Sequence, residues 1–169
     1  MYFMKVNIAL LTVTDTRTFE NDKSGGILVK KIEEANHNLA DRKICKDNKE
    51  DIKSIINKWL KEKDIDVIIT TGGTGLTGRD ITPEALNDIA DKHIPGFGEM
   101  FRYISIKSVG TSSIQSRACA VLAKGKYVFA LPGSSGGVTD AWDEILKYQL
   151  DINHKPCNFV ELFPRLKEK

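Results

Sequence analysis

Hydrophobic positions along the chain form two alternating patterns. Short, nearly continuous apolar runs occur over 6–13, 67–69 and 128–131, with a weaker run over 39–45. Runs of this kind are typical of strands buried on both faces by helices. Between the runs, apolar residues recur at spacings of three and four, which predicts helices with one buried face over 24–36, 52–60, 97–104 and 138–146. The alternation of strand and helix predicts an α/β protein.

Local signals indicate where two of these helices begin. Asp47, with Glu50 three residues later, has the pattern of an N-cap with its capping-box partner. Thr82 followed by Pro83 is typical of an N-cap with proline at the first helical position. We therefore expect helices to begin within a residue or two of Asp47 and of Thr82.

One pair of strands is expected to be antiparallel. The segments 117–122 and 127–131 are apolar, and Lys124-Gly125-Lys126 between them has the composition of a tight turn. The expected fold class is therefore α/β, a three-layer α/β/α architecture with a mostly parallel sheet and one antiparallel strand. The pattern leaves the order of the strands open.

Composition narrows the class of protein. The chain has 169 residues, which suits a single domain over 1–169 with a continuous core. Because 25 Lys and Arg residues nearly balance 23 Asp and Glu residues, the net charge of +2 gives no argument for attraction to nucleic acid or membranes. The three cysteines show no metal-ligand spacing and predict no disulfide framework, which fits a reducing cytoplasm. The apolar run at 6–13 is too short to span a membrane.

Nine of the 13 glycines gather in three segments, each at the end of a predicted strand or the start of a predicted helix. In open α/β sheets, ligands bind outside the carboxyl ends of the strands. Glycine there lets backbone N–H groups approach an anion, of which phosphate is the usual example. The three segments, 72–78, 96–98 and 133–137, are therefore candidate ligand-binding loops.

The strongest candidate is the loop over 70–80. Its glycines match the G-x-G-x-x-G spacing of a dinucleotide-binding fingerprint, but Thr82-Pro83 delays the helix that this motif needs at its third glycine. A P-loop is disfavoured because Arg79 and Asp80 stand where Lys and Ser or Thr are required. What remains is either a phosphate-cradling loop with a cation and a carboxylate at its exit, or a tight turn that needs glycine.

A second loop covers 131–137, between an apolar strand and a predicted helix. Its hydroxyl and N–H donors suit another anionic group. Ser134 equally suits the N-cap of the following helix. Both interpretations stay open.

Four motifs occur in order along the chain. They are Thr70-Thr-Gly-Gly-Thr-Gly75, Gly78-Arg-Asp-Ile-Thr-Pro-Glu84, Ile94-Pro-Gly-Phe-Gly-Glu99 and Leu131-Pro-Gly133. In this order they closely resemble the MogA/MoaB family of molybdenum cofactor biosynthesis proteins, and the similarity covers essentially the whole chain. The loop Ser134-Ser-Gly-Gly137 departs from the MogA pattern, and the resemblance therefore leans towards the MoaB branch.

The resemblance implies a three-layer α/β/α fold, a molybdopterin-binding site, and assembly as a trimer or a hexamer of two trimers. Members of the MogA type are adenylyltransferases, which attach AMP from ATP to the terminal phosphate of molybdopterin with Mg²⁺ and release pyrophosphate. A downstream molybdate-insertion protein is a further implied partner. The alternative hypothesis is a non-catalytic molybdopterin-binding or carrier protein of the same fold. A dinucleotide-dependent oxidoreductase is a weaker third hypothesis.

Residue by residue, the resemblance places the family's catalytic, Mg²⁺-binding carboxylates on Asp80 and Asp47. The chemistry agrees, because Mg²⁺ is usually held by one or two carboxylates together with phosphate oxygens. Helix capping is the alternative role of Asp47, and that of Asp80 is an ordinary surface acid. The resemblance places the ligand-binding loops on Gly72, Gly73, Thr74, Gly75, Arg79, Pro132, Gly133 and Ser134, with Thr14, Asp15 and Ser24 as further candidates.

Two expectations concern the arrangement of these parts. The segments 72–80 and 132–134 should meet Asp47 in one cleft at the carboxyl edge of the parallel strands, because each follows a predicted strand end. The apolar C-terminal segment Phe159-Val-Glu-Leu-Phe163 must also be covered. It packs either against a neighbouring subunit or over the chain's own core.

Overall fold

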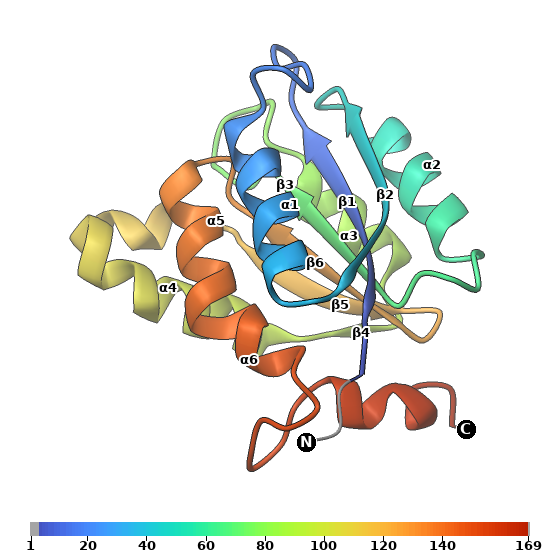
Figure 1. Ribbon diagram of the computed structural model, residues 1–169. Coiled ribbons are helices and arrows are strands. Elements are labelled where there is room, and N and C mark those ends of the chain that lie inside the picture. Colours follow the sequence, from blue (N-terminus) through green and yellow to red (C-terminus); the bar gives the residue numbers. More distant parts are fainter. Residues whose placement is uncertain (1–3, 169) are drawn as a thin grey trace.

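A six-stranded sheet forms the middle of the computed structural model, which describes residues 4–168 (Figure 1). The strands are β1 (Asn7–Val13), β2 (Asn38–Cys45), β3 (Val67–Thr71), β4 (Lys92–His93), β5 (Cys119–Ala123) and β6 (Lys126–Leu131). They lie in the order β2-β1-β3-β6-β5-β4. The first four in this order are parallel, and β5 runs antiparallel to both of its neighbours. Residues 1–3 and 169 of the predicted domain lie outside the described residues.

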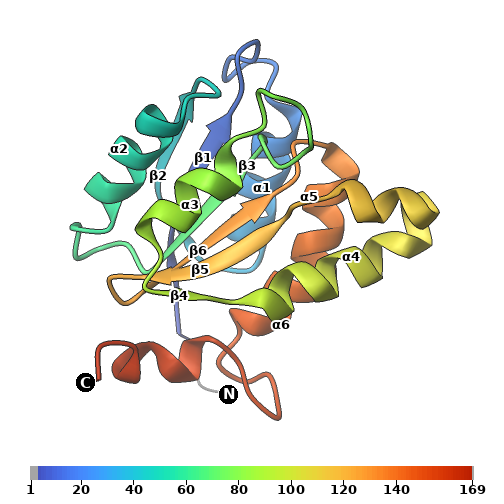
Figure 2. The ribbon, with the colours of Figure 1, turned by 180° about the vertical axis from the view of Figure 1, so that it is seen from behind.

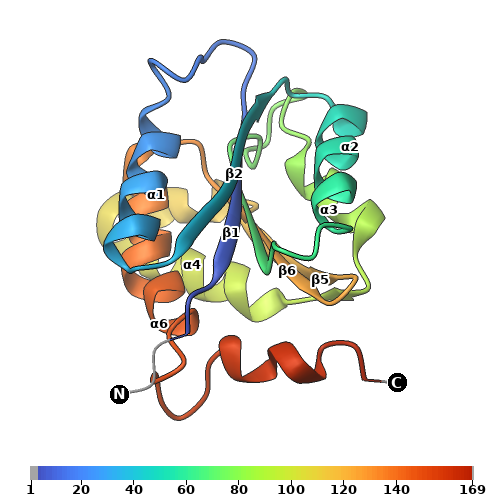
Figure 3. The same cartoon turned by 45° about the vertical axis from the view of Figure 1, so that its right-hand side comes forward.

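Helices cover both faces of the sheet (Figure 2 and Figure 3). One face carries α1 (Lys23–Glu34), α4 (Pro95–Val109), α5 (Ser135–Ala141) and α6 (Lys147–Gln149), and the other carries α2 (Lys49–Trp59) and α3 (Thr82–Ile89). The predicted three-layer α/β/α class with one antiparallel strand is thereby confirmed. None of the helices within residues 4–168 is long and apolar enough to cross a membrane.

The two helical layers explain why the strand sequences are almost continuously apolar. On β1, Ile8 and Leu10 belong to the core beneath α1, α4 and α5, whereas Ala9 and Leu11 belong to the core beneath α2 and α3. All four side chains are fully buried. Because successive side chains of a strand point to opposite faces, a sheet that is covered twice leaves no polar face.

Both helices begin within two residues of the predicted positions, but each predicted N-cap residue is wrong by one position. The N-cap of α2 is Asn48, whose side chain accepts hydrogen bonds from the N–H groups of Glu50 and Asp51. The N-cap position of α3 is Ile81, and Thr82 is the first helical residue. The Thr82 hydroxyl instead donates to the Gly72 carbonyl at 2.8 Å. Since Asn48 takes the capping role, the Asp47 carboxylate is not needed for it.

Two further features have no counterpart in the predicted pattern. The edge strand β4 has only two residues, both exposed, which pair with Val121 and Leu122 of β5. The predicted helix over 138–146 is helical but is interrupted, since a π-helical turn (Trp142–Leu146) joins α5 to α6. Its predicted apolar face nevertheless packs into the core.

The C-terminal segment packs over the chain's own core, which is the second of the two fates considered for it. Phe159 lies against Tyr127 with ring centroids 4.6 Å apart, and Phe163 lies 5.8 Å from the same ring. Val160, in the final 3₁₀ turn (Val160–Arg165), is fully buried. The segment therefore gives no argument for a subunit interface.

Candidate functional site

Loops from four parallel strands meet at one edge of the sheet. β1, β2, β3 and β6 all end there, because they run in the same direction. A cavity of about 560 Å³ opens at this edge, lined by the predicted loop residues Gly73, Thr74, Gly75, Asp80, Pro132, Gly133 and Ser134. Asp47 lies beside Gly73 at the same edge, although it is not part of the cavity wall. The structure thus brings the two predicted loops and both predicted carboxylates together.

The glycine loop is shaped by close contacts to its neighbours. Gly73 has a φ of +67°, and a side chain there would run into the Thr82 hydroxyl and lie 3.2 Å from Asp47 Oδ1. A Cβ on Gly75 would lie 2.8 Å from Asp80 Oδ2. The Thr82 N–H donates to the Gly73 carbonyl at 3.0 Å and holds the loop to the start of α3. Glycine is therefore required where the backbone passes the two carboxylates.

Asp80 is fixed and ionised by its own loop. Its Oδ2 accepts hydrogen bonds from the Thr77 N–H at 2.8 Å and from Thr77 Oγ1 at 2.7 Å. Burial raises the pKa of Asp80, but these bonds, one from the Gly75 N–H and the positive charge of Arg117 together bring the pKa below its usual value. The carboxylate therefore stays charged beside the cavity at neutral pH.

Asp47 has the opposite electrostatic environment. Burial raises its pKa first, and the negative charge of Asp80 raises it further. The two carboxylates are thus close enough to repel one another, which is the situation that a shared cation relieves. Hard oxygen donors of this kind fit Mg²⁺, which keeps several waters and takes further ligands from phosphates. Within residues 4–168 no group of three or more His, Cys, Asp or Glu could hold a metal ion by itself.

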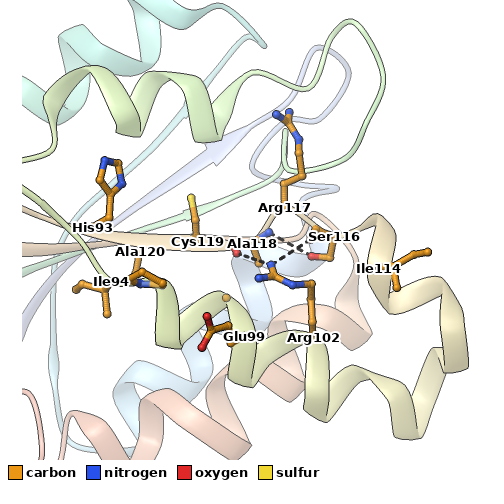
Figure 4. A pocket seen from close by; sticks show the side chains of 12 residues that line it. His93, Ile94, Glu99, Arg102, Ile114, Ser116, Arg117, Ala118, Cys119 and Ala120 are labelled. Carbon is orange, nitrogen blue, oxygen red and sulfur yellow. Dashed lines mark hydrogen bonds between the residues drawn. The ribbon is translucent and has the colours of Figure 1, made fainter.

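Arg117 holds the glycine loop through hydrogen bonds to its backbone carbonyls. The sequence analysis missed this residue. Its Nε donates to the Gly75 carbonyl at 2.7 Å, its Nη2 donates to the Asp80 carbonyl at 2.9 Å, and its Nη1 pairs with Glu84. Figure 4 shows Arg117 pointing away from Arg102, and both arginines line a second cavity of about 500 Å³ beside β5. Arg117 is therefore a positioning residue of the loop, because it bonds the carbonyls on both sides of the turn.

Asp15, a predicted candidate in the loop after β1, connects that loop to the loops that carry Asp47 and Arg79. Asp15 forms an ion pair with Arg79 and accepts a hydrogen bond from the Asp47 N–H at 3.3 Å. Thr14 Oγ1 accepts from two N–H groups within its own loop. Asp15 and Arg79 therefore pair with one another next to Asp47, and neither of them lines the cavity.

A second arginine, also missed by the sequence analysis, connects this loop to the loop after β6. Arg17 Nη1 donates to Ser24 Oγ at 2.8 Å and to the Gly133 carbonyl at 3.0 Å. Ser24, a predicted binding candidate, is buried and donates in turn to Asp22. The structure thus gives Ser24 a bonding role beneath the loops and does not place it in the cavity wall.

Hydroxyl groups line much of the remaining wall of the cavity. Ser134 accepts a hydrogen bond from the Gly137 N–H at 3.1 Å, which confirms its N-cap role, and it also lines the cavity. Binding of an anion there stays a prediction. The opposite wall comes from α4 and the 3₁₀ turn after it (Gly110–Gln115), and sequence analysis missed its serines, which are Ser105, Ser108, Ser112, Ser113 and Ser116.

We expect Gly73→Ala to destabilise the fold by about 1–3 kcal/mol. A side chain at this positive φ is strained, and its Cβ collides with Thr82. Gly78→Ala is the matched control in the same loop, because no atom lies within 4 Å of its Cβ position. Urea denaturation of both variants measures the difference, and equal midpoints would contradict the proposed packing of the loop.

Fold and site together define a class of protein. It is an α/β domain whose sheet is covered by helices on both faces, with a cavity lined by a glycine-rich loop and two neighbouring carboxylates at the strand ends. Residues 9–152 match the family described as "Probable molybdopterin binding domain". The chain belongs to this family. It is 42% identical over 166 residues to "Molybdenum cofactor biosynthesis protein B" of Escherichia coli (strain K12), a comparison that covers 98% of this chain and 96% of that protein.

Solved structures give the same result. A crystal structure of a molybdenum cofactor biosynthesis protein B superposes with a TM-score of 0.89 at 37% identity and covers all of both chains. The structure described as the "tungsten cofactor synthesizing protein MoaB from Pyrococcus furiosus" superposes with a TM-score of 0.77 at 33% identity, covering 86% of this chain and 92% of that one. The resemblance to the MogA/MoaB family, and to its MoaB branch, is confirmed.

Proposed function

We propose that the chain acts in molybdenum cofactor biosynthesis as a molybdopterin adenylyltransferase. Membership of the family supports the general role, and the arrangement of the site supports the specific reaction. In that reaction a terminal phosphate oxygen of molybdopterin attacks the α-phosphorus of ATP. A new P–O–P bond forms, the bond to the β-phosphate breaks, and pyrophosphate leaves. The adenylylated pterin is then the substrate of the downstream molybdate-insertion protein.

One observation carries the specific reaction. Asp47 and Asp80 come from different strand ends, lie on either side of the glycine loop, and are close enough for the Asp80 charge to raise the pKa of Asp47. Two neighbouring carboxylates at the edge of a ligand cavity are unfavourable without a cation. Mg²⁺ held by Asp47 and Asp80 would neutralise the charge that the phosphates of both substrates bring together.

The chain's own residues supply orientation. Backbone groups of Gly73, Thr74 and Gly75 border the cavity, and Arg117 holds this loop through its carbonyls. Thr77 keeps Asp80 in one position through two hydrogen bonds. A carboxylate held in this way needs little rearrangement when charge develops on the phosphates. Such preorganised charge lowers the energy of the transition state and so accelerates the reaction.

The experiment that tests this proposal incubates the chain with molybdopterin, ATP and Mg²⁺ and follows the release of pyrophosphate. Release that requires all three components supports an adenylyltransferase. Reactions without molybdopterin control for plain hydrolysis of ATP. If molybdopterin binds but no pyrophosphate appears, the chain is the non-catalytic binding or carrier protein instead.

We further expect the chain to assemble as a trimer or a hexamer of two trimers. The family resemblance motivates the number, and closed symmetry would give every subunit the same site. Light scattering over a dilution series measures the mass in units of the 18.9 kDa chain. Three or six chains would agree with this expectation, whereas one or two chains at every concentration would contradict it.

A further inference from the structure

The cavity at the strand ends contains a second carboxylate that the proposed reaction does not use. Asp140 lies on α5 and lines the same cavity as Asp80. It lies six positions after the N-cap Ser134, which places it about 9 Å further along the helix at 1.5 Å per residue. The cavity thus extends from the glycine loops into the gap between α4 and α5.

Asp140 is held in a defined orientation. Ser108 Oγ on α4 donates to Asp140 Oδ2 at 2.9 Å across this gap. Within residues 4–168 it is the only side chain hydrogen-bonded to Asp140, which leaves Oδ1 able to accept from a ligand. Asp140 itself is only half-buried, so a ligand can reach it. The carboxylate is therefore oriented by the protein and has unused acceptor capacity.

The cavity wall that α4 contributes combines apolar and hydroxyl side chains. Phe101, Ser105, Ser108 and Val109 all line the cavity and lie on one face of α4, at helical spacings of four, seven and eight residues. Phe101 is buried and Val109 is half exposed towards solvent. Among the described residues that line the cavity, both charged side chains are carboxylates, Asp80 and Asp140. A ligand group beside Asp140 must therefore present hydrogen-bond donors rather than a phosphate.

We propose that Asp140, positioned by Ser108, recognises the 2-amino-4-oxopyrimidine edge of the pterin. This contact would place the pterin ring at the end of the cavity between α4 and α5. This inference rests on the proposed function. The pterin edge carries two adjacent N–H donors, at N3 and on the 2-amino group, in the fork geometry that pairs with a carboxylate. Adenine has no such pair of adjacent donors, so the base of ATP binds elsewhere. The phosphate of molybdopterin then points towards the glycine loop and Asp80.

The test compares two fluorescent probes in the full-length protein: the phosphate ester of 6-hydroxymethylpterin and the matching lumazine ester. Lumazine carries a 2-oxo group in place of the 2-amino group, so it offers an acceptor where the pterin offers a donor. We expect the native chain to bind the pterin ester about ten- to hundredfold more tightly, the range of a hydrogen bond to a charged group. Asp140→Asn should lose most of this preference, and Ser108→Ala should lose part of it.

Two variants control for unrelated effects. Ser54→Ala removes a hydroxyl from the exposed surface of α2, and Asp64→Asn removes a carboxylate from an exposed surface; neither residue lines the cavity. Both should keep the native preference for the pterin ester. A general loosening of the fold would weaken both probes equally and leave their ratio unchanged, so the ratio reports recognition of the 2-amino group.

The possible results separate this inference from the proposed function. If pyrophosphate release requires molybdopterin and Asp140→Asn keeps the full preference for pterin over lumazine, the assignment of Asp140 is wrong while the proposed function stands. The assignment is also wrong if the native chain does not distinguish the two esters. Tighter binding of GMP, whose guanine presents the same donor edge, would overturn the choice of a pterin. If neither molybdopterin nor the pterin ester binds, both the inference and the proposed function fail.

Discussion

Asp80→Ala is expected to slow adenylyl transfer at least about a thousandfold, while molybdopterin binding stays within a few-fold of the native value. Losing a metal ligand removes charge stabilisation that is needed mainly in the transition state, and several kcal/mol of barrier correspond to this change in rate. Turnover is measured by pyrophosphate release, and binding by the fluorescence of the pterin. An unchanged turnover would remove Asp80 from the catalytic assignment.

Asp80→Asn is the control for disturbance of the loop. The amide oxygen of Asn can still accept the hydrogen bonds from Thr77, whereas the negative charge is lost. We expect this variant to bind molybdopterin like the native chain and to remain inactive. If alanine abolishes binding and asparagine restores it, the defect of the alanine variant lies in the shape of the loop.

Asp22→Ala is expected to lower the free energy of unfolding by about 3–5 kcal/mol. The Asp22 side chain is fully buried and accepts hydrogen bonds from Thr12 Oγ1 at 2.7 Å, from the Gly25 N–H at 3.0 Å and from Arg42 Nη2 at 3.0 Å. It therefore joins β1, α1 and β2, and its removal leaves the partly buried Arg42 guanidinium without its partner. Thermal or urea unfolding measures the loss.

Asp143→Ala is the matched control for this prediction. Asp143 pairs with Lys31 at 2.6 Å, but its side chain is 43% exposed. An ion pair that solvent reaches contributes little, so we expect a loss of about 1 kcal/mol or less. Similar losses for the two variants would show that burial does not set the contribution of Asp22.

The pKa of Asp22 predicts how the stability of the native chain depends on pH. Burial raises the pKa of Asp22, but the hydrogen bonds from Thr12 and Gly25 and the contacts with Arg42 outweigh burial and lower it below 3.8. A carboxyl group with a lower pKa in the folded state stabilises the fold above its unfolded pKa, and this contribution is lost as the pH falls through the folded pKa. The native chain should therefore lose more stability on acidification than Asp22→Ala does.

The layers of the fold could be predicted because they follow from local patterns. Doubly buried strands such as β1 need apolar residues on both faces, and helices on a sheet need one apolar face. Strand order depends on crossovers that leave no mark in the pattern. The two exposed residues of β4 carry no hydrophobic signal. Asp47 and Asn48 are both good N-caps, and their spacing alone does not decide between them.

The site could be predicted only where it follows strand ends. The glycine loop and Asp80 are contiguous in the sequence, so a motif reveals them. Arg117 bonds residues 37 and 42 positions away, and Arg17 bonds Gly133 across 116 positions. Such contacts leave no local signal. The serines of α4 look like the ordinary polar face of an amphipathic helix, and only the position of α5 shows that Ser108 faces Asp140.

Transfer of a label from ATP tests the central claim most directly. The chain is incubated with molybdopterin, Mg²⁺ and ATP that is labelled at the α-phosphorus, and the pterin product is isolated. Adenylyl transfer predicts that the label moves to molybdopterin, with one pyrophosphate released for each labelled product, and that the transfer stops when Mg²⁺ is removed. If molybdopterin is bound by the chain while the label stays in ATP, the protein is not an adenylyltransferase.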